Sequence, residues 1–327
     1  MKRRAVIFLG GVVATAPRWL RGQVTRRPRI GYLLLSPLTE PPSRERQAFL
    51  DGLREQGYIP GASVEMMYRS AEGEPEFIDA ACGELLEQKP DVIAVSGAIA
   101  VLAAKKATRS VPIVMLAVGD PVGIGAVSSL AKPGGNVTGV SFISSDLAPK
   151  RLQFARECLP RAKRLATIWD NRNANARAES RAVLAAARQI GLDNEPLGLG
   201  SDAELSRVLR RLAAAKPDIM YVVFEGGLAA GNRTTLADFG LRHQVPIVSG
   251  WSFLTEAGAL LSYAPDIAAM FRRAAYYVAR ALKGAKPADL PIELPTKVDL
   301  VINLRTARTI GIIVPRQLLL RADRVIE

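Results

Sequence analysis

Two stretches of this chain follow the same pattern. KPDVIAVSG at 89–97 is followed by a helical stretch and then by VPIV at 111–114, and KPDIMYVVF at 216–224 leads in the same way to VPIV at 245–248. Short apolar runs that alternate with amphipathic helices are typical of parallel strands buried on both faces. The repetition therefore predicts an α/β protein of two lobes, each a Rossmann-like parallel sheet flanked by helices.

The alternation of strand and helix begins at Arg29 and runs through both repeats. In the first repeat, strands are predicted at 29–36, 63–70, 90–97, 111–118 and 136–142, and helices at 43–58, 76–88 and 98–110. In the second, strands are predicted at 164–170, 194–200, 217–225 and 245–250, and helices at 147–160, 176–191, 202–216 and 231–244.

The domain organisation follows from the repeat. Residues 1–28 form a separate N-terminal segment, 29–144 with part of 265–327 form lobe 1, and 145–264 with part of the C-terminal tail form lobe 2. The amphipathic stretch 266–284 lies beyond the second repeat, so we expect it to cross back to lobe 1. More than one crossover would make a hinge, and two hinged lobes enclose a cleft that closes on a ligand.

The first residues resemble an export signal. MKRR precedes the apolar run AVIFLGGVVATA, which is shorter than the roughly 20 residues that a membrane-spanning helix needs. Ala14-Thr15-Ala16 fits a cleavage pattern, but Pro17 is a poor neighbour for cleavage, which favours a cut nearer Gln23. We expect a periplasmic protein, exported by the general or, given Arg3-Arg4, the twin-arginine route. An uncleaved anchor and a buried strand with basic flanks are the alternatives.

The positive charge of the chain is concentrated at its N-terminus. The net charge is +13, but residues 1–29 hold eight Lys and Arg residues and no acid, and removing these eight leaves +5 for the remainder. No basic stripe interleaved with aromatic residues follows, so a nucleic-acid partner is not expected.

The chain has few residues suited to catalysis or metal binding. Cys82 and Cys158 both fall in predicted helices, and the single histidine, His243, is best placed as a helix C-terminal residue. No G-x-S-x-G motif accompanies them. We therefore expect no catalytic residue and no metal.

The glycine-rich stretch GDPVGIGAVSSLAKPGGNVTGVSF at 119–142 poses the question of a phosphate-binding loop. Gly123-Ile124-Gly125 follows the fourth strand of its lobe rather than the first, and Ser128 stands where a dinucleotide fingerprint has its third glycine. The stretch is better interpreted as the rim of the cleft and the approach to a crossover.

The ligand of a parallel sheet lies beyond the carboxyl ends of its strands. The candidate ligand-binding residues at these positions are Ser36, Ser96, Gly97, Ala98, Asp120, Ser141, Asp170, Glu225, Trp251 and Ser252.

Several of these positions have a structural alternative. Ser96 and Gly97 could hold a carboxylate at a helix N-terminus or merely cap that helix. Asp120 could bind a ligand or tie its own turn. Asp170 and Glu225 could pair with a cationic group or cap the next helix, and Trp251 could stack on a ring.

Three blocks of the chain resemble one known family. FLDGLREQGYIPGASVEMMYRSAEG (49–73), GDPVGIGAVSSLAKPGGNVTGVSF (119–142) and the tail from Leu290 to Glu327 are similar to the substrate-binding proteins of ABC transporters with the type I periplasmic-binding fold, closest to the TrpX-like branch. The resemblance implies an exported, monomeric, cofactor-free clamp that delivers a small organic ligand to a permease in the inner membrane. An amino acid, aromatic or hydrophobic, is the first candidate ligand.

Two other function classes remain open at this point. A cytoplasmic two-lobed enzyme, such as a racemase or a nucleotide-dependent oxidoreductase, would share the architecture. The racemase would need paired cysteines on loops, and the oxidoreductase would need a glycine fingerprint after the first strand. The effector domain of a repressor would need an N-terminal helix-turn-helix, and a hydrophobic segment occupies that place.

Overall fold

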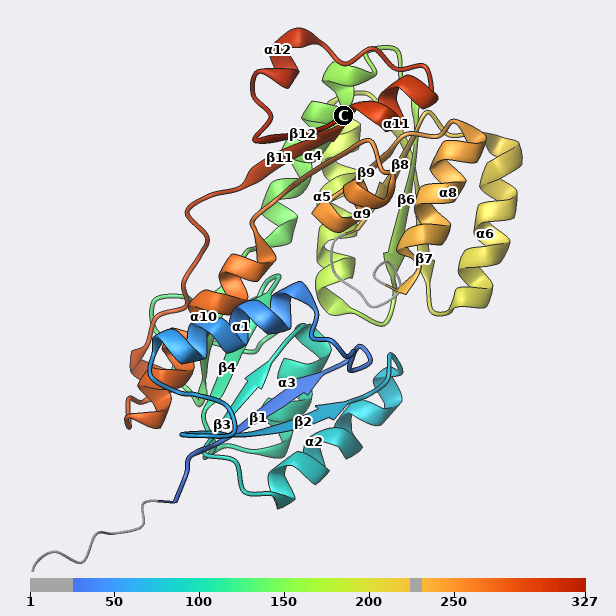
Figure 1. The fold of residues 1–327 in the computed structure, drawn as a ribbon. Helices are drawn as coiled ribbons and strands as arrows, with labels where there is room; N and C mark the ends of the chain where they lie inside the picture. The colour runs from blue at the N-terminus through green and yellow to red at the C-terminus, as the bar shows by residue number, and fades with distance from the viewer. Residues whose placement is uncertain (1–25, 224–230) are drawn as a thin grey trace, which may run out of the picture.

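The computed structural model describes residues 26–223 and 231–327, which form two lobes, each built around one sheet (Figure 1). The sheet of lobe 1 has five strands in the order β2-β1-β3-β4-β5, and the sheet of lobe 2 has seven in the order β12-β11-β10-β9-β8-β6-β7. The predicted fold class, two parallel-sheet α/β lobes flanked by helices and joined by crossovers, is confirmed.

Lobe 1 consists of the first five strands with the helices that cover them. Its strands are β1 (Arg29–Leu34), β2 (Glu65–Ser70), β3 (Val92–Val95), β4 (Ile113–Val118) and β5 (Val137–Ser141), all paired in parallel. Its helices are α1 (Arg44–Glu55), η1 (Pro75–Phe77), α2 (Ile78–Glu87), α3 (Ala98–Ala107) and, from the tail, α10 (Ile267–Leu282) and η2 (Pro287–Asp289).

Lobe 2 contains the remaining elements. Its strands are β6 (Arg164–Asp170), β7 (Asp193–Leu199), β8 (Ile219–Val222), β9 (Ile247–Ser249), β10 (Leu261–Ala264), β11 (Asp299–Asn303) and β12 (Arg324–Ile326). Its helices are α4 (Ser144–Cys158), α5 (Ala174–Gln189), α6 (Asp202–Ala215), α8 (Arg233–His243), α9 (Ser252–Ala257), α11 (Leu304–Thr309) and α12 (Arg316–Leu319).

One strand of lobe 2 departs from the expected parallel arrangement. β11 runs antiparallel to β10, with Leu261 opposite Ile302. The chain reaches β11 from lobe 1, through residues 290–298, instead of returning over its own sheet in a helix. A parallel βαβ connection is therefore absent at this point, and the strand enters from the opposite end.

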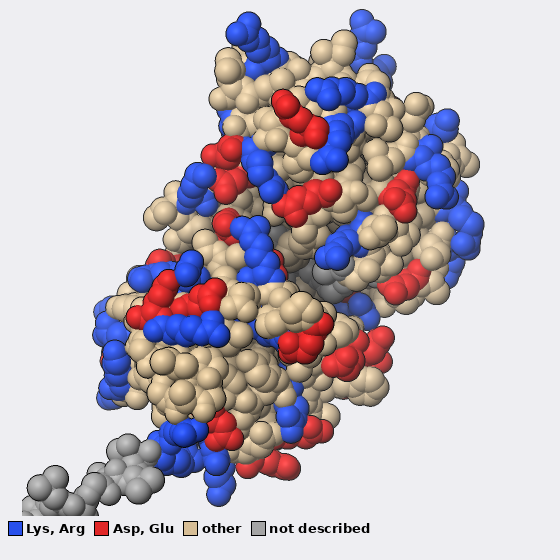
Figure 2. Space-filling model, viewed as in Figure 1, with Lys and Arg blue, Asp and Glu red and all other residues tan. Residues whose placement is uncertain are grey.

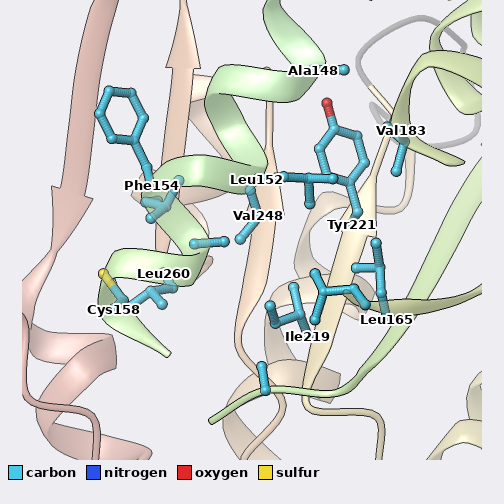
Figure 3. Packing of buried hydrophobic residues seen from close by; sticks show 14 of the residues in the cluster. Ala148, Leu152, Phe154, Cys158, Leu165, Val183, Ile219, Tyr221, Val248 and Leu260 are labelled. Carbon is cyan, nitrogen blue, oxygen red and sulfur yellow. The ribbon is translucent and has the colours of Figure 1, made fainter. Parts of the chain in front are cut away.

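The apolar side chains of each sheet divide between its two faces. In β3, Val92 and Ala94 pack toward α1 and α10, whereas Ile93 and Val95 pack toward α2 and α3. In lobe 2, α4 covers one face: Leu152 lies near Val248 of β9 and Tyr221 of β8 (Figure 3), whereas the Phe154 ring lies 5.1 Å from the Tyr263 ring of β10, centroid to centroid. Burial on both faces explains why the strands read as continuous apolar runs in the sequence.

Three segments of chain connect the lobes: β5 leads into α4, β10 leads into α10, and residues 290–298 lead into β11. The first and third lie side by side, because the backbone N–H of Ser141 donates to the carbonyl of Glu293 and the N–H of Glu293 donates to the carbonyl of Gly139. In Figure 1 these connections gather on one side of the junction.

The surface view shows basic and acidic side chains interspersed over both lobes, with a hollow where the lobes meet (Figure 2). Within residues 26–223 and 231–327, no helix combines the length and the apolar character that crossing a bilayer requires. The predicted export segment lies almost entirely in residues 1–25, outside the described residues.

Candidate ligand site between the lobes

The carboxyl ends of the strands in the two sheets approach each other at the junction of the lobes. Asn175, near the start of α5 in lobe 2, lies against Gly119 and Asp120, which follow β4 in lobe 1. Trp251, which follows β9, packs against the hydrophobic cores of both lobes. Binding sites in open parallel sheets form at such an edge, and here two such edges meet.

In lobe 1, the predicted residues after β1 and β3 lie at neighbouring strand ends. Ser36 is exposed, and its carbonyl accepts a hydrogen bond of 2.8 Å from the hydroxyl of Ser70. Gly97, with φ of 83°, is the N-cap of α3, and no side chain of the described residues caps this helix. The capping alternative for Ser96 is therefore wrong. The first N–H groups of α3, beginning at Ala98, point toward the strand-end edge as potential donors.

Asp120 serves its own turn. Its Oδ1 accepts from the backbone N–H of Gly123 at 2.8 Å, and a Cβ at Gly123 would lie only 2.0 Å from Asp120 Oδ2. The first glycine of the Gly-Ile-Gly sequence is thus needed for the close approach of this carboxylate, which is a sufficient structural reason for its presence.

Ser141 ends β5 at the first crossover. The residue is fully buried, and its hydroxyl has no hydrogen-bond partner among the described residues. A buried hydroxyl without a partner carries a desolvation penalty that a ligand or a water molecule can relieve. Among the predicted residues, Ser141 therefore has a buried hydroxyl whose hydrogen bonding is not satisfied within the described part of the chain.

In lobe 2, Asp170 ends β6 and is bound by its neighbour. Its carboxylate accepts from the backbone N–H, Nε and Nη2 of Arg172 at 2.9–3.0 Å. The hydrogen bond and charge of Asp170, together with the charges of Glu74 and Glu76 in lobe 1, raise the pKa of Arg172. Asp170 thus holds a cation of its own chain, and that cation faces acidic residues across the junction.

Trp251 and Ser252 begin α9. The Trp251 ring lies 4.6 Å from the Phe253 ring, centroid to centroid, and its backbone N–H donates to the hydroxyl of Ser249. The indole is half-buried, so part of its surface remains open at the edge. Glu225 lies outside the described residues, within 224–230.

A buried polar cluster lies behind this edge, where α4 and α5 meet β8. Arg151 and Glu179 form an ion pair of 2.8 Å with both side chains fully buried. The hydroxyls of Tyr221 and Ser144 donate to the same carboxylate at 2.7 and 2.5 Å, and Arg151 Nε donates to the carbonyl of Tyr263. Burial raises the pKa of Tyr221 well above its usual range, so its hydroxyl remains a neutral donor.

Sequence reasoning did not identify Arg172, Asn173 or Asn175 as important. The signal was present in DNRNAN at 170–175, where three polar residues stand between the end of a strand and the start of a helix. Asn173 caps α5, because its side chain accepts from the N–H groups of Asn175 and Ala176. The contact that Asn175 makes with lobe 1 depends on the tertiary structure and leaves no local pattern.

The cysteines and the histidine occupy structural positions. Cys82 in α2 and Cys158 in α4 are buried, and burial raises the pKa of the Cys158 thiol to about 12. His243 ends α8, where its ring lies against Phe239. No group of three His, Cys, Asp or Glu residues in the described part of the chain is arranged to hold a metal ion.

Comparison with known proteins supports a ligand-binding role for this architecture. The model of a family described as ABC transporter substrate binding protein matches residues 38–326. A curated relative, the tyrosine-binding protein of Clostridioides difficile strain R20291, is 25% identical over 279 residues, which cover 84% of this chain and 79% of the relative.

Two solved structures are similar over most of the chain. One is an ABC domain from Streptococcus pneumoniae in complex with L-Trp, with 26% identity and a TM-score of 0.85. The other is a conserved domain protein from Vibrio cholerae, with 27% identity and a TM-score of 0.86. Each match covers 92% of this chain and 100% of the other. The family and the relatives named for a ligand are transport proteins and not enzymes.

Proposed function

The chain belongs to the ABC transporter substrate-binding protein family, and on that premise we propose that it captures an aromatic amino acid between its lobes. The observation that carries the proposal is the meeting of two strand-end edges, with the half-buried Trp251 packed against both lobes. A tyrosine-binding relative and the L-Trp complex of a similar protein support the choice of ligand class.

The edge offers a complementary group for each part of an amino acid. The carboxylate would bind at Ser96, Gly97 and Ala98, where the N-terminus of α3 presents uncapped N–H groups. The aromatic ring would stack on Trp251, and the hydroxyl of Ser141 would contribute a hydrogen bond. Asp120 and Glu225 stay the predicted partners of the ammonium group.

Delivery to a permease and residence in the periplasm complete the proposal. Proteins of this family that serve importers are typically exported, which agrees with the signal-like sequence of residues 1–28. The lobes would close on the ligand, and the closed form, a monomer, would present both lobes to the permease.

Thermal unfolding with a panel of ligands tests the ligand class. L-tyrosine or L-tryptophan at one hundred times its Kd should stabilise the protein by about 2.7 kcal/mol, because only the folded state binds. L-leucine and L-glutamate serve as controls for an aliphatic and an acidic side chain. If neither aromatic amino acid raises the melting temperature at millimolar concentration, the aromatic assignment is wrong.

A pair of serine variants tests the carboxylate position. Ser96→Ala should weaken binding of the stabilising amino acid about threefold to tenfold, since it removes one hydrogen bond to a charged group. Ser110→Ala, at an exposed serine beyond the far end of α3, is the matched control and should leave Kd unchanged. Equal Kd values for both variants and the wild type would place the carboxylate elsewhere.

A further inference from the structure

Asn175 joins the two lobes through a side chain that the proposed ligand contacts do not include. The residue is 3% exposed, and its carboxamide oxygen, oriented as its surroundings require, accepts from the backbone N–H groups of Gly119 and Asp120, each at 3.2 Å. These donors follow β4 of lobe 1, whereas Asn175 stands in the first turn of α5 of lobe 2. The two hydrogen bonds therefore cross the junction.

Both sides of this contact are held firmly. In lobe 2, the carboxamide oxygen of Asn173 fixes the start of α5, and Asp170 fixes the preceding turn through the N–H of Arg172. In lobe 1, the carbonyl of Gly119 accepts from the N–H of Ser144, at the point where the first crossover enters α4. A rotation about the crossover would leave the bond between Gly119 and Ser144 in place and would move Asn175 relative to Gly119.

A second interaction crosses the junction from the same turn. Arg172, three residues before Asn175, lies within the electrostatic influence of Glu74 and Glu76 of lobe 1. The segment 170–175 is thus where lobe 2 approaches lobe 1 by both charge and hydrogen bonds. The Asp120 carboxylate accepts from Gly123 within its own turn. The contact between the lobes uses the backbone N–H groups of Gly119 and Asp120, so the hydrogen bond from Gly123 to Asp120 Oδ1 is kept.

We propose that Asn175 is a closure contact: its carboxamide oxygen binds Gly119 and Asp120 only when the lobes are together, and the two hydrogen bonds break when the lobes separate. The inference rests on the proposed clamp function. It adds a residue, Asn175, that shifts the equilibrium between the open and closed forms toward the closed form. In the closed form, the two N–H groups donate to this carboxamide oxygen, whereas in the open form they donate to water instead.

Small-angle X-ray scattering of the ligand-free protein tests the contact without knowledge of the ligand. Asn175→Ala should have a larger radius of gyration than the wild type, because the variant loses two hydrogen bonds that, on this proposal, exist in the closed form alone. Asn175→Asp retains an acceptor for both N–H groups and should match the wild type. Arg181→Ala, at an exposed position on the same helix, is the control for a substitution on α5.

Binding of L-tryptophan and L-tyrosine supplies the second readout. The Kd of Asn175→Ala should rise about tenfold over that of Arg181→Ala, while the radius of gyration at saturating ligand should equal that of the wild type. A contact present in both forms would lower the melting temperature of Asn175→Ala and leave its Kd and its ligand-free radius unchanged, which would overturn the proposal.

Hydrogen exchange on the unmodified protein avoids any dependence on the variant's folding. The amides of Gly119 and Asp120 should exchange faster in the ligand-free protein than in the complex; equal, slow exchange in both would contradict a contact that opens. If no amino acid binds, the ligand assignment fails, and the radius of the ligand-free Asn175→Ala protein still decides whether Asn175 holds the lobes together.

Discussion

At the level of single residues, the strand-end rule selected positions at the carboxyl ends of strands but did not assign the role of each side chain. Asp120 and Asp170 both lie where the sequence places them, at the ends of β4 and β6, yet each is engaged within three residues, by Gly123 and Arg172. Such local pairings depend on turn geometry, and the same acidic residue type suits a ligand equally well. The roles of Ser96, Ser141 and Trp251 in binding stay predictions.

The ion pair between Arg151 and Glu179 gives a prediction at this scale. Glu179→Gln keeps the shape of the side chain but leaves the Arg151 cation fully buried without its counter-charge. We expect a loss of about 3–5 kcal/mol in the free energy of unfolding, measured by urea denaturation.

A double variant separates the effect of the buried charge on stability from the effect of lost side-chain contacts in that cluster. Arg151→Met with Glu179→Gln removes both charges and should be less destabilised than Glu179→Gln alone, because the isolated cation is gone. A double variant that is less stable than the single one would show that the hydrogen bonds of Arg151 to Tyr221 and Tyr263 stabilise the fold by more than the loss of the Glu179 charge costs.

At the level of elements, periodicity predicted most helices and strands closely. The strand at 164–170 has the bounds expected, and α1 ends at Glu55, two residues before Gly57, which has φ of 85°. The tail was harder, since β10 and β12 have four and three residues and owe their conformation to pairing with distant strands. Short strands of this kind leave too little periodicity to detect.

Two glycines on different helices allow a matched test of how closely α10 approaches lobe 1. A Cβ at Gly52 of α1 would lie 2.4 Å from the carbonyl oxygen of Arg272 on α10, whereas a Cβ at Gly83 of α2 would meet nothing within 4 Å. Gly52→Ala should therefore cost about 1–3 kcal/mol by forcing the helices apart. Gly83→Ala should stabilise by about 0.5–1 kcal/mol through helix propensity.

The expected changes in the free energy of unfolding have opposite signs: Gly52→Ala should destabilise the protein and Gly83→Ala should stabilise it. Both variants replace a helical glycine by alanine, so propensity alone would stabilise both, as thermal unfolding would show. Stabilisation by Gly52→Ala would mean that α10 does not rest closely on α1.

At the level of the whole molecule, the repeat in the sequence predicted two lobes and a tail that returns to the first. We propose that the lobes move as the units 29–144 with α10 and 145–264 with β11 and β12. The antiparallel entry of β11 could not be deduced, because the path of residues 290–298 between the lobes is set by their packing rather than by local sequence.

At this scale, the proposed export gives a testable prediction. Protein recovered from the periplasm should lack its N-terminal residues, with a mature start near Gln23, as N-terminal sequencing or intact mass would show. A chain that begins at Val24 retains Arg26 and its ion pair with Asp91 and should unfold at the same temperature as the exported protein. Recovery of the full-length chain from the cytoplasm alone would contradict the proposed destination.

The pairing of β5 with the segment around Glu293 determines how the molecule is able to move. Because the hydrogen bonds between Ser141, Gly139 and Glu293 fasten two of the three connections together, the lobes are attached at two points, that pair and the link at Pro265. Two attachment points define one hinge axis, so one lobe can rotate relative to the other about the line that joins these points, and other rotations are resisted. Opening and closing should therefore follow one path, and the same strand-end edges of the two lobes should meet at each closure.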